Sequence, residues 1–423
     1  MTDYWVIIID SFERDFASIC WVVYSHKLFK NKKVCLLPSH DIDLDFFIKE
    51  MPDAIIWNYA RKNNLPYLKL CYKLGIYNII HDTEGICNNM ERYYFCALDL
   101  KDFKWINEIW CWGEEQTQIL KRRVGKYSQN LKIRNTGSIR YEYVKSLPKC
   151  DFKSQLGEVL WNTNFPSLNP KFQSLEKEFN NQMKVNRDDK DTVIKMFLNN
   201  ASIREGCRIF IDNLLEKFHH KFNLTVRPHP FESISYYQNI KNKFKEINIR
   251  PDGDLHEDIN NYSLVIQYGC QTSLDSFLRE IPSIKPLRSN KNIWSKVTPF
   301  VETENCKEQL FSKKFLQKIL NEQRKLFKEY NISSIVNNLE KELLLPEVRL
   351  KRKDIKQKAS NLIYVPIFYL RFLIKKKALQ FFVYFNIRSR KINKYNLSEL
   401  QSFLKVKYPK SKWSVNKKCL LYP

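Results

Sequence analysis

Short apolar runs alternate with longer amphipathic stretches along most of the chain. In the first half, five runs have the length of strands: Tyr4–Ile9, Lys33–Leu37, Ala54–Trp57, Ile76–Ile80 and Glu108–Trp112. After a polar break near Pro148 the pattern begins again, with expected strands at Glu158–Trp161, Leu224–Arg227, Ile247–Arg250 and Leu264–Gln267. Buried strands that alternate with helical stretches are typical of parallel sheets with crossover helices. The pattern therefore predicts an α/β fold.

The stretches between these runs predict helices and two domains. The expected helices are Phe16–Lys30, Phe172–Phe197, Arg204–Phe222, Leu274–Arg279 and most of Ser312–Leu344. A chain of 423 residues exceeds what one hydrophobic core usually supports. We expect an N-terminal domain at residues 1–150, a second domain at 151–345 and a separate tail at 346–423. Two open α/β domains that face each other form a cleft where the carboxyl ends of their strands meet.

The positive charge is concentrated in the tail. The formal net charge is +25, and residues 349–394 contain fourteen Lys and Arg residues against one acidic residue, Asp354. Aromatic side chains such as Phe368, Phe372 and Phe382 are interleaved with this charge. A cationic helical segment with aromatic anchors is suited to an anionic membrane surface. The other interpretation is a helical hairpin that packs on the two domains.

Location is inferred from the N-terminus, the longest apolar run and the cysteines. The chain opens without a basic segment followed by a long apolar core, so no signal peptide is expected. The run Leu362–Ile374 is shorter than the roughly 20 residues of a membrane-spanning helix. Eleven cysteines without CxxC pairs are typical of buried thiols in a reducing compartment. We expect a cytoplasmic protein, peripheral on the inner face of the plasma membrane.

The first polar cluster is His81-Asp82-Thr83-Glu84-Gly85, directly after an expected strand. In extended chain, residues two apart point the same way, so Asp82 and Glu84 project together. Paired carboxylates at a strand end suit general base chemistry on an acceptor hydroxyl. The alternative is a structural turn, with Asp82 as the N-cap of a helix and Gly85 for backbone freedom.

The second cluster, Arg227-Pro228-His229-Pro230, follows the apolar residues Leu224–Val226 of an expected strand. The prolines restrict the backbone and hold His229 in an extended loop. A rigid histidine beside an arginine is suited to bind a phosphate and to offset the charge of a leaving nucleotide. The alternative is a structural histidine in a proline turn.

Two further clusters also follow expected strands. In Tyr268–Ser273, hydroxyl and backbone N–H groups come at the start of an expected helix, where they form a phosphate cradle or an ordinary N-cap. In Asn162–Pro166, amide and hydroxyl groups hydrogen-bond a sugar or phosphate, or shape an Asx turn. The candidate binding residues are Gly269, Gln271, Thr272 and Ser273 in the first, and Asn162, Thr163 and Asn164 in the second.

Taken in order, these motifs resemble the bacterial surface carbohydrate biosynthesis proteins of the GT-B glycosyltransferase superfamily. More distantly, they resemble the sialyltransferases and Kdo transferases that use CMP-sugars. The resemblance spans roughly residues 5 to 345. The residues that match the family's motifs are Asp82, Glu84 and Gly85, His229 and Pro230, Thr272 and Ser273, Asn162–Phe165, and the turn Asn135–Arg140 with Gly137 and Arg140. Thr83 stands where the family pattern has a second acid, and Asp275 stands where a Glu is commoner.

The resemblance implies two Rossmann-like domains of GT-B type, with the acceptor at the N-terminal domain and the nucleotide-sugar at the second. It makes Glu84 or Asp82 the catalytic carboxylate and places His229 against the donor phosphate, with Thr272 and Ser273 beside it. It implies a CMP-linked sugar similar to Kdo or sialic acid, and a glycan or lipid-linked acceptor in a surface polysaccharide or lipopolysaccharide. It implies neither a metal nor a further cofactor, since protein groups replace the metal.

Three alternatives stay open. A glycerol- or ribitol-phosphate transferase that uses CDP-polyols could share this fold and the phosphate-binding histidine. A nucleic-acid-binding protein would account for the charge but not for four polar clusters at strand ends, and no zinc, helix-turn-helix or RNP pattern is present. A non-catalytic scaffold would account for Thr83. We expect a nucleotide-sugar partner and no nucleic acid.

Overall fold

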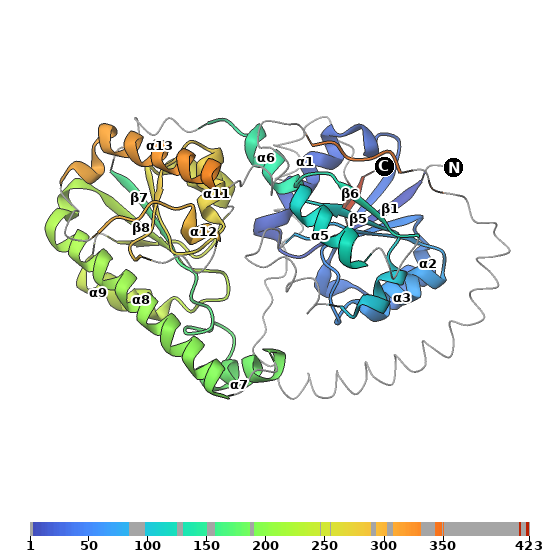
Figure 1. Cartoon of the computed structure of the whole chain (residues 1–423), viewed down its shortest axis with the longest axis horizontal. Helices are drawn as coiled ribbons and strands as arrows, with labels where there is room; N and C mark the ends of the chain where they lie inside the picture. The colour runs from blue at the N-terminus through green and yellow to red at the C-terminus, as the bar shows by residue number, and fades with distance from the viewer. Residues whose placement is uncertain are drawn as a thin grey trace. The chain divides into compact units, whose positions relative to one another are not determined.

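A computed structural model (Figure 1) describes residues 3–83, 98–124, 130–149, 157–186, 190–245, 247–253, 255–288, 293–302, 308–330, 343–348, 350, 414–415 and 420–422. Glu84 and Gly85 lie outside the described residues, as does nearly all of the basic segment 349–394. The chain divides into a first unit of residues 1–143 with 333–423, and a second unit of residues 144–332. Each unit has its own parallel sheet, which confirms the predicted fold class of two Rossmann-like α/β domains.

The sheet of the first unit has the strand order β12-β13-β2-β1-β3-β4-β5-β6. Six of its strands are parallel, and they are β1 (Tyr4–Ile9), β2 (Lys33–Pro38), β3 (Ala54–Trp57), β4 (Tyr77–Ile80), β5 (Glu108–Cys111) and β6 (Lys132–Asn135). The five predicted strands are confirmed. The sixth, β6, was not predicted, because as an edge strand it is only half-buried and carries Lys132 and Arg134.

The end of the chain adds two short strands to this sheet. β13 (Leu420–Tyr422) pairs antiparallel with β2, and β12 (Ser414–Val415) pairs with β13. The tail at 346–423 was expected to be separate and helical, and for these five residues that expectation is wrong. The edge of β2 offers unpaired backbone groups, and an apolar triplet satisfies them by adding a strand.

Helices cover both faces of the first sheet. Val6 and Ile8 point to the face packed by α2 (Leu44–Glu50), α3 (Leu65–Lys73) and α5 (Glu114–Val124). Trp5, Ile7 and Ile9 point to the other face, with α1 (Ala17–Ser25) and α6 (Ile139–Ser146). Leu343, Leu345 and Val348 also pack there. Residues 343–348 therefore pack with the first unit, whereas the second domain was expected to extend to residue 345.

The sheet of the second unit has the order β11-β10-β7-β8-β9, and all its strands are parallel. They are β7 (Glu158–Asn162), β8 (Asn223–Arg227), β9 (Asn248–Ile249), β10 (Leu264–Ile266) and β11 (Ser283–Ile284). The chain runs outward from β7 through β8 to β9 and then returns to the other side of β7. This reversal leaves a topological switch point between β7 and β10, where ligands of open α/β sheets commonly bind.

The helices of the second unit differ from the predicted ones in their bounds. They are α7 (Leu175–Asn186), α8 (Lys190–Phe218), α9 (Ser235–Lys243), α10 (Leu255–Asp258), α11 (Thr272–Leu278), α12 (Ile293–Lys296) and α13 (Lys313–Glu329). α8 is one helix of 29 residues, although a break was predicted between residues 197 and 204. No proline interrupts it, and its apolar side packs beside α13 on one face of the sheet. Among the described helices, none has the length and apolar content needed to cross a bilayer.

Candidate functional site

The second unit brings three of the four polar clusters to one edge of its sheet. β7 lies between β8 and β10, so the loops that follow these three strands are neighbours. Asn162, at the end of β7, donates from Nδ2 to Thr272 Oγ1 at 2.9 Å and to Cys270 Sγ at 3.6 Å. Two clusters separated by more than 100 residues in sequence are therefore in direct contact.

A buried glutamate joins the loops after β7 and β8. Glu232 is 2% exposed, and its carboxylate accepts hydrogen bonds from Thr163 Oγ1 at 3.1 Å, from Phe165 N at 2.6 Å and from the Tyr237 hydroxyl. Burial raises the pKa of Glu232 above its ordinary value, although these donors act in the opposite direction. Sequence reasoning missed this residue, because a single acid in a polar loop gives no signal by spacing.

Arg227 lies inside the domain. The residue is 9% exposed, and the guanidinium donates from Nη1 to Asp258 Oδ2 at 2.9 Å and to the Asp252 carbonyl at 3.3 Å. It also donates to the Gly253 carbonyl. These bonds tie the end of β8 to the turn before α10. The guanidinium was expected to bind phosphate. That role stays a prediction, and a phosphate would have to replace some of the hydrogen bonds observed here.

His229 is half-buried between a buried Pro228 and an exposed Pro230. The backbone N–H of Phe231 donates to His229 Nδ1 at 3.2 Å. A nitrogen that accepts a hydrogen bond carries no proton, so the proton of the neutral ring is on Nε2. The loop thus determines the tautomer of the ring and makes Nε2–H its donor.

The start of α11 is packed more tightly than a phosphate cradle requires. Thr272 is 2% exposed and contacts Asn162 and Cys270. Ser273 is fully buried, and its hydroxyl bonds Thr298 Oγ1 at 2.9 Å and Gln323 Nε2 at 3.2 Å. Gly269 has a φ of 60°, in the left-handed region that favours glycine. Gln271 is half-buried with its Nε2 atom buried, and Asn164 is exposed, so the outer surface of the cluster is formed by Asn164 and His229.

In the first unit, His81, Asp82 and Thr83 directly follow β4. His81 is 5% and Asp82 3% exposed, whereas Thr83 is half-buried. The His81 ring stacks on Trp112 at 6.2 Å between centroids, and its Nδ1 lies 3.4 Å from the Trp110 carbonyl oxygen. Burial lowers the pKa of His81 from 6.5 to about 4, so the ring is neutral at pH 7. The expected partnership of Asp82 with Glu84 stays a prediction.

A charged cluster that was not predicted follows β1. Arg14 lies in the π-helix η1 (Phe12–Phe16) and bonds Asp10 Oδ2 at 2.9 Å, Asp15 Oδ1 at 2.7 Å and Thr83 Oγ1 at 3.2 Å. Asn58, after β3, donates to Asp10 Oδ1 at 3.0 Å. The ends of β1, β3 and β4 are therefore linked by polar side chains. The polar run Asp10–Asp15 directly follows a strand, so the criterion used for the other clusters could have found it.

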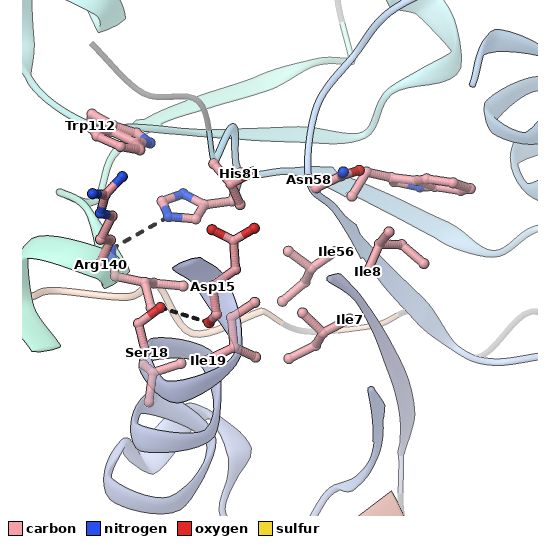
Figure 2. Close-up of a pocket in the computed structure, with 14 residues that line it drawn as sticks. Ile7, Ile8, Asp15, Ser18, Ile19, Ile56, Asn58, His81, Trp112 and Arg140 are labelled. Carbon is pink, nitrogen blue, oxygen red and sulfur yellow. Dashed lines mark hydrogen bonds between the residues drawn. The ribbon is translucent and has the colours of Figure 1, made fainter. Parts of the chain in front are cut away.

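This edge of the first sheet also holds a small pocket. Ile7, Ile19 and Ile56 line its apolar side (Figure 2). Asp15 and His81 point toward one another within it, and Arg140, predicted as a cleft residue, lies on its lining. The pocket combines an apolar wall with a buried carboxylate and a neutral imidazole.

No protein-family model matches this sequence, and no curated protein sequence matches it. Several solved structures are similar to this chain. One is the UDP-GlcNAc 2-epimerase of Methanocaldococcus jannaschii in complex with UDP-GlcNAc and UDP. Its sequence identity is 12% and its TM-score 0.45, and the match covers 86% of this chain and 99% of the epimerase. The UDP-GlcNAc 2-epimerase of Neisseria meningitidis bound to UDP-GlcNAc has 10% identity and a TM-score of 0.45, over 78% and 100% of the two chains. The wall teichoic acid polymerase TagF, soaked with CDPG, has 8% identity and a TM-score of 0.44, over 79% and 85%. Similarities at this level say nothing about activity.

Proposed function

We propose that the protein is a glycosyltransferase that binds the nucleotide of an activated sugar at the carboxyl edge of the second unit's sheet. The observation that supports this most is the joining of three polar loops at the switch point of a parallel sheet. Asn162 bonds Thr272, and Thr163 bonds Glu232, so the loops after β7, β8 and β10 are held together. Such an edge is where open α/β sheets bind nucleotides.

The chemistry of this edge is suited to a phosphorylated leaving group. The Nε2–H of His229 is a directed donor, and a donor to a phosphate oxygen stabilises the charge that develops as the nucleotide leaves. The exposed side-chain amide of Asn164 adds a donor and an acceptor for hydroxyl groups. We assign the general base to Asp82 or Glu84, and we expect no metal because protein donors fill its role.

The finer proposal is a CMP-linked donor similar to Kdo or sialic acid and an acceptor in a surface polysaccharide or lipopolysaccharide. In this proposal the basic segment 349–394 holds the enzyme on the anionic inner face of the plasma membrane, where a lipid-linked acceptor is found. We assign the acceptor to the first unit.

The proposal predicts that cytidine nucleotides raise the melting temperature of the protein. A ligand that binds only the folded state at one hundred times its Kd adds about 2.7 kcal/mol of stability, a shift of several degrees. We expect CMP to give the largest shift among CMP, UDP and GDP, and His229→Ala to remove it. The matched control is His220→Ala, a change at an exposed histidine of the same unit. A larger shift with UDP or GDP overturns the cytidine assignment, and no shift with any nucleotide overturns the proposed site.

Donor turnover separates the two transferase classes. With no acceptor added, we expect slow release of CMP from CMP-Kdo or CMP-sialic acid, measured by chromatography, and its loss in Glu84→Gln. Release of CMP from CDP-glycerol alone would instead assign the protein to the polyol-phosphate transferases. Binding of DNA or RNA that weakens steeply with salt, with no donor turnover, would favour the nucleic-acid-binding alternative.

A further inference from the structure

An aromatic ring is exposed beside the candidate phosphate-binding histidine. Phe231 is 60% exposed, although a phenylalanine gains stability from burial. Its ring centroid lies 5.5 Å from that of His229, with 40° between the ring planes. The exposed ring therefore lies directly beside the His229 imidazole.

The backbone that carries this ring is held on both sides. Lys171 N donates to the Phe231 carbonyl at 2.9 Å, and Ser233 N donates to the Asn169 carbonyl at 2.8 Å. The Asn169 side chain donates to the Ser233 carbonyl at 2.6 Å, and Pro170 and Glu232 form an antiparallel bridge. Residues 169–171 and 231–233 thus form a short hydrogen-bonded antiparallel segment, which joins the loops after β7 and β8 and holds the backbone of Phe231 in place.

The neighbours of Phe231 add an aromatic support and a positive charge. Phe172 contacts the Phe231 ring edge-to-face, with 6.0 Å between centroids. The ammonium of Lys171 lies 5.4 Å from the centroid of the Phe172 ring. A supported aromatic surface beside a cation is suited to a planar ligand that carries negative charge.

We propose that Phe231 is the stacking surface for the base of the nucleotide whose phosphate His229 binds. The inference rests on the proposed function, since it names a contact within the same site. Base–aromatic stacking tolerates any base, because every base has a π-face. Phe231 therefore contributes affinity for nucleotides as a class, and discrimination between cytidine and uridine comes from hydrogen-bonding groups elsewhere in the site.

The test compares two probes that differ only in the base, CMP and ribose 5-phosphate, titrated into the full chain by NMR. We expect Phe231→Ala to weaken CMP binding about ten- to hundredfold, the range of a lost base–aromatic contact, and to leave ribose 5-phosphate within twofold. Phe231→Trp should retain CMP affinity. The matched control is Ile234→Ala, because Ile234 is also exposed, at 46%, and lies three residues further along the chain.

Three results would overturn the inference. Unchanged CMP affinity in Phe231→Ala would place the ring outside the site. Equal weakening of CMP and ribose 5-phosphate would assign the ring to the sugar or phosphate. Loss of binding to anionic phospholipid vesicles with unchanged CMP affinity would assign it to a lipid surface. Failure of the unchanged protein to bind any nucleotide is a different result, because it overturns the proposed function itself.

Discussion

Replacing Asp258 by alanine is expected to lower the free energy of unfolding of the second unit by about 3–5 kcal/mol. Asp258 is 7% exposed, and its carboxylate accepts a hydrogen bond from Arg227 Nη1 at 2.9 Å. Without it, the Arg227 guanidinium is left at the end of β8 as a buried charge that has lost its counter-ion. Urea unfolding monitored by tryptophan fluorescence measures the change.

The same carboxylate provides a matched control. Arg250 Nη2 lies 2.9 Å from Asp258 Oδ1, but the Arg250 side chain is 43% exposed. Exposed ion pairs contribute at most about 1 kcal/mol, so Arg250→Ala should have a small effect. If Asp258→Ala costs no more than Arg250→Ala, Arg227 does not depend on this ion pair, and its guanidinium is available to bind a phosphate as first expected.

The ion pair between Arg227 and Asp258 also affects how a loss of nucleotide binding in an Arg227 variant should be interpreted. Arg227 hydrogen-bonds the turn before α10. A substitution of Arg227 that weakens nucleotide binding should therefore also lower the free energy of unfolding. A change at His229 should weaken binding alone, since the Phe231 N–H bond to its ring is a local contact within the loop. Variants of these two residues, which are separated only by Pro228, are therefore expected to differ in their effect on stability.

The stability of the first unit is expected to fall by about 3 kcal/mol between pH 7 and pH 4 because of His81. Burial lowers the pKa of His81 from 6.5 to about 4, while the Trp110 carbonyl and the Asp15 charge oppose the change. The unfolded chain therefore takes up a proton at a higher pH than the folded chain. The contribution is fully present above about pH 6.5 and is lost as the pH falls toward 4.

A variant without the imidazole isolates this effect from the carboxylates that titrate in the same range. The difference in unfolding free energy between the unchanged protein and His81→Gln should narrow as the pH falls from 7 to 4. Denaturant unfolding at four pH values measures it. A difference that stays constant across the range would mean that His81 is not the group that titrates.

The strands were predictable because a buried parallel strand is apolar on both faces. Ile7 and Ile8 point to opposite faces of the first sheet and are both buried, so the run Tyr4–Ile9 has no polar interruption. This signal weakens at sheet edges. β6 carries two basic residues, and β11 has only two residues, Ser283 and Ile284, so neither stands out in the sequence.

Within the candidate site, the sequence indicated which loops matter but not which side chains face solvent. Asn162, Thr272 and His229 lie at the ends of neighbouring strands, as expected from their positions after apolar runs. Ser273 instead turns to Thr298 and Gln323, 25 and 50 residues further along the chain. Arg227 turns to Asp258 in the same way. Such partners follow no period, so they cannot be read from spacing.

By itself the sequence determined the two parallel sheets and the placing of polar loops at their carboxyl ends, because hydrophobic burial repeats along the chain with the period of each element. Only the tertiary structure decided that β10 pairs with β7 and that Glu232 hydrogen-bonds the loop after β7. It also decided that Phe231 is exposed while its backbone is hydrogen-bonded to the loop after β7. These features depend on contacts between distant residues, whose free energy comes from the packed arrangement and leaves no local pattern.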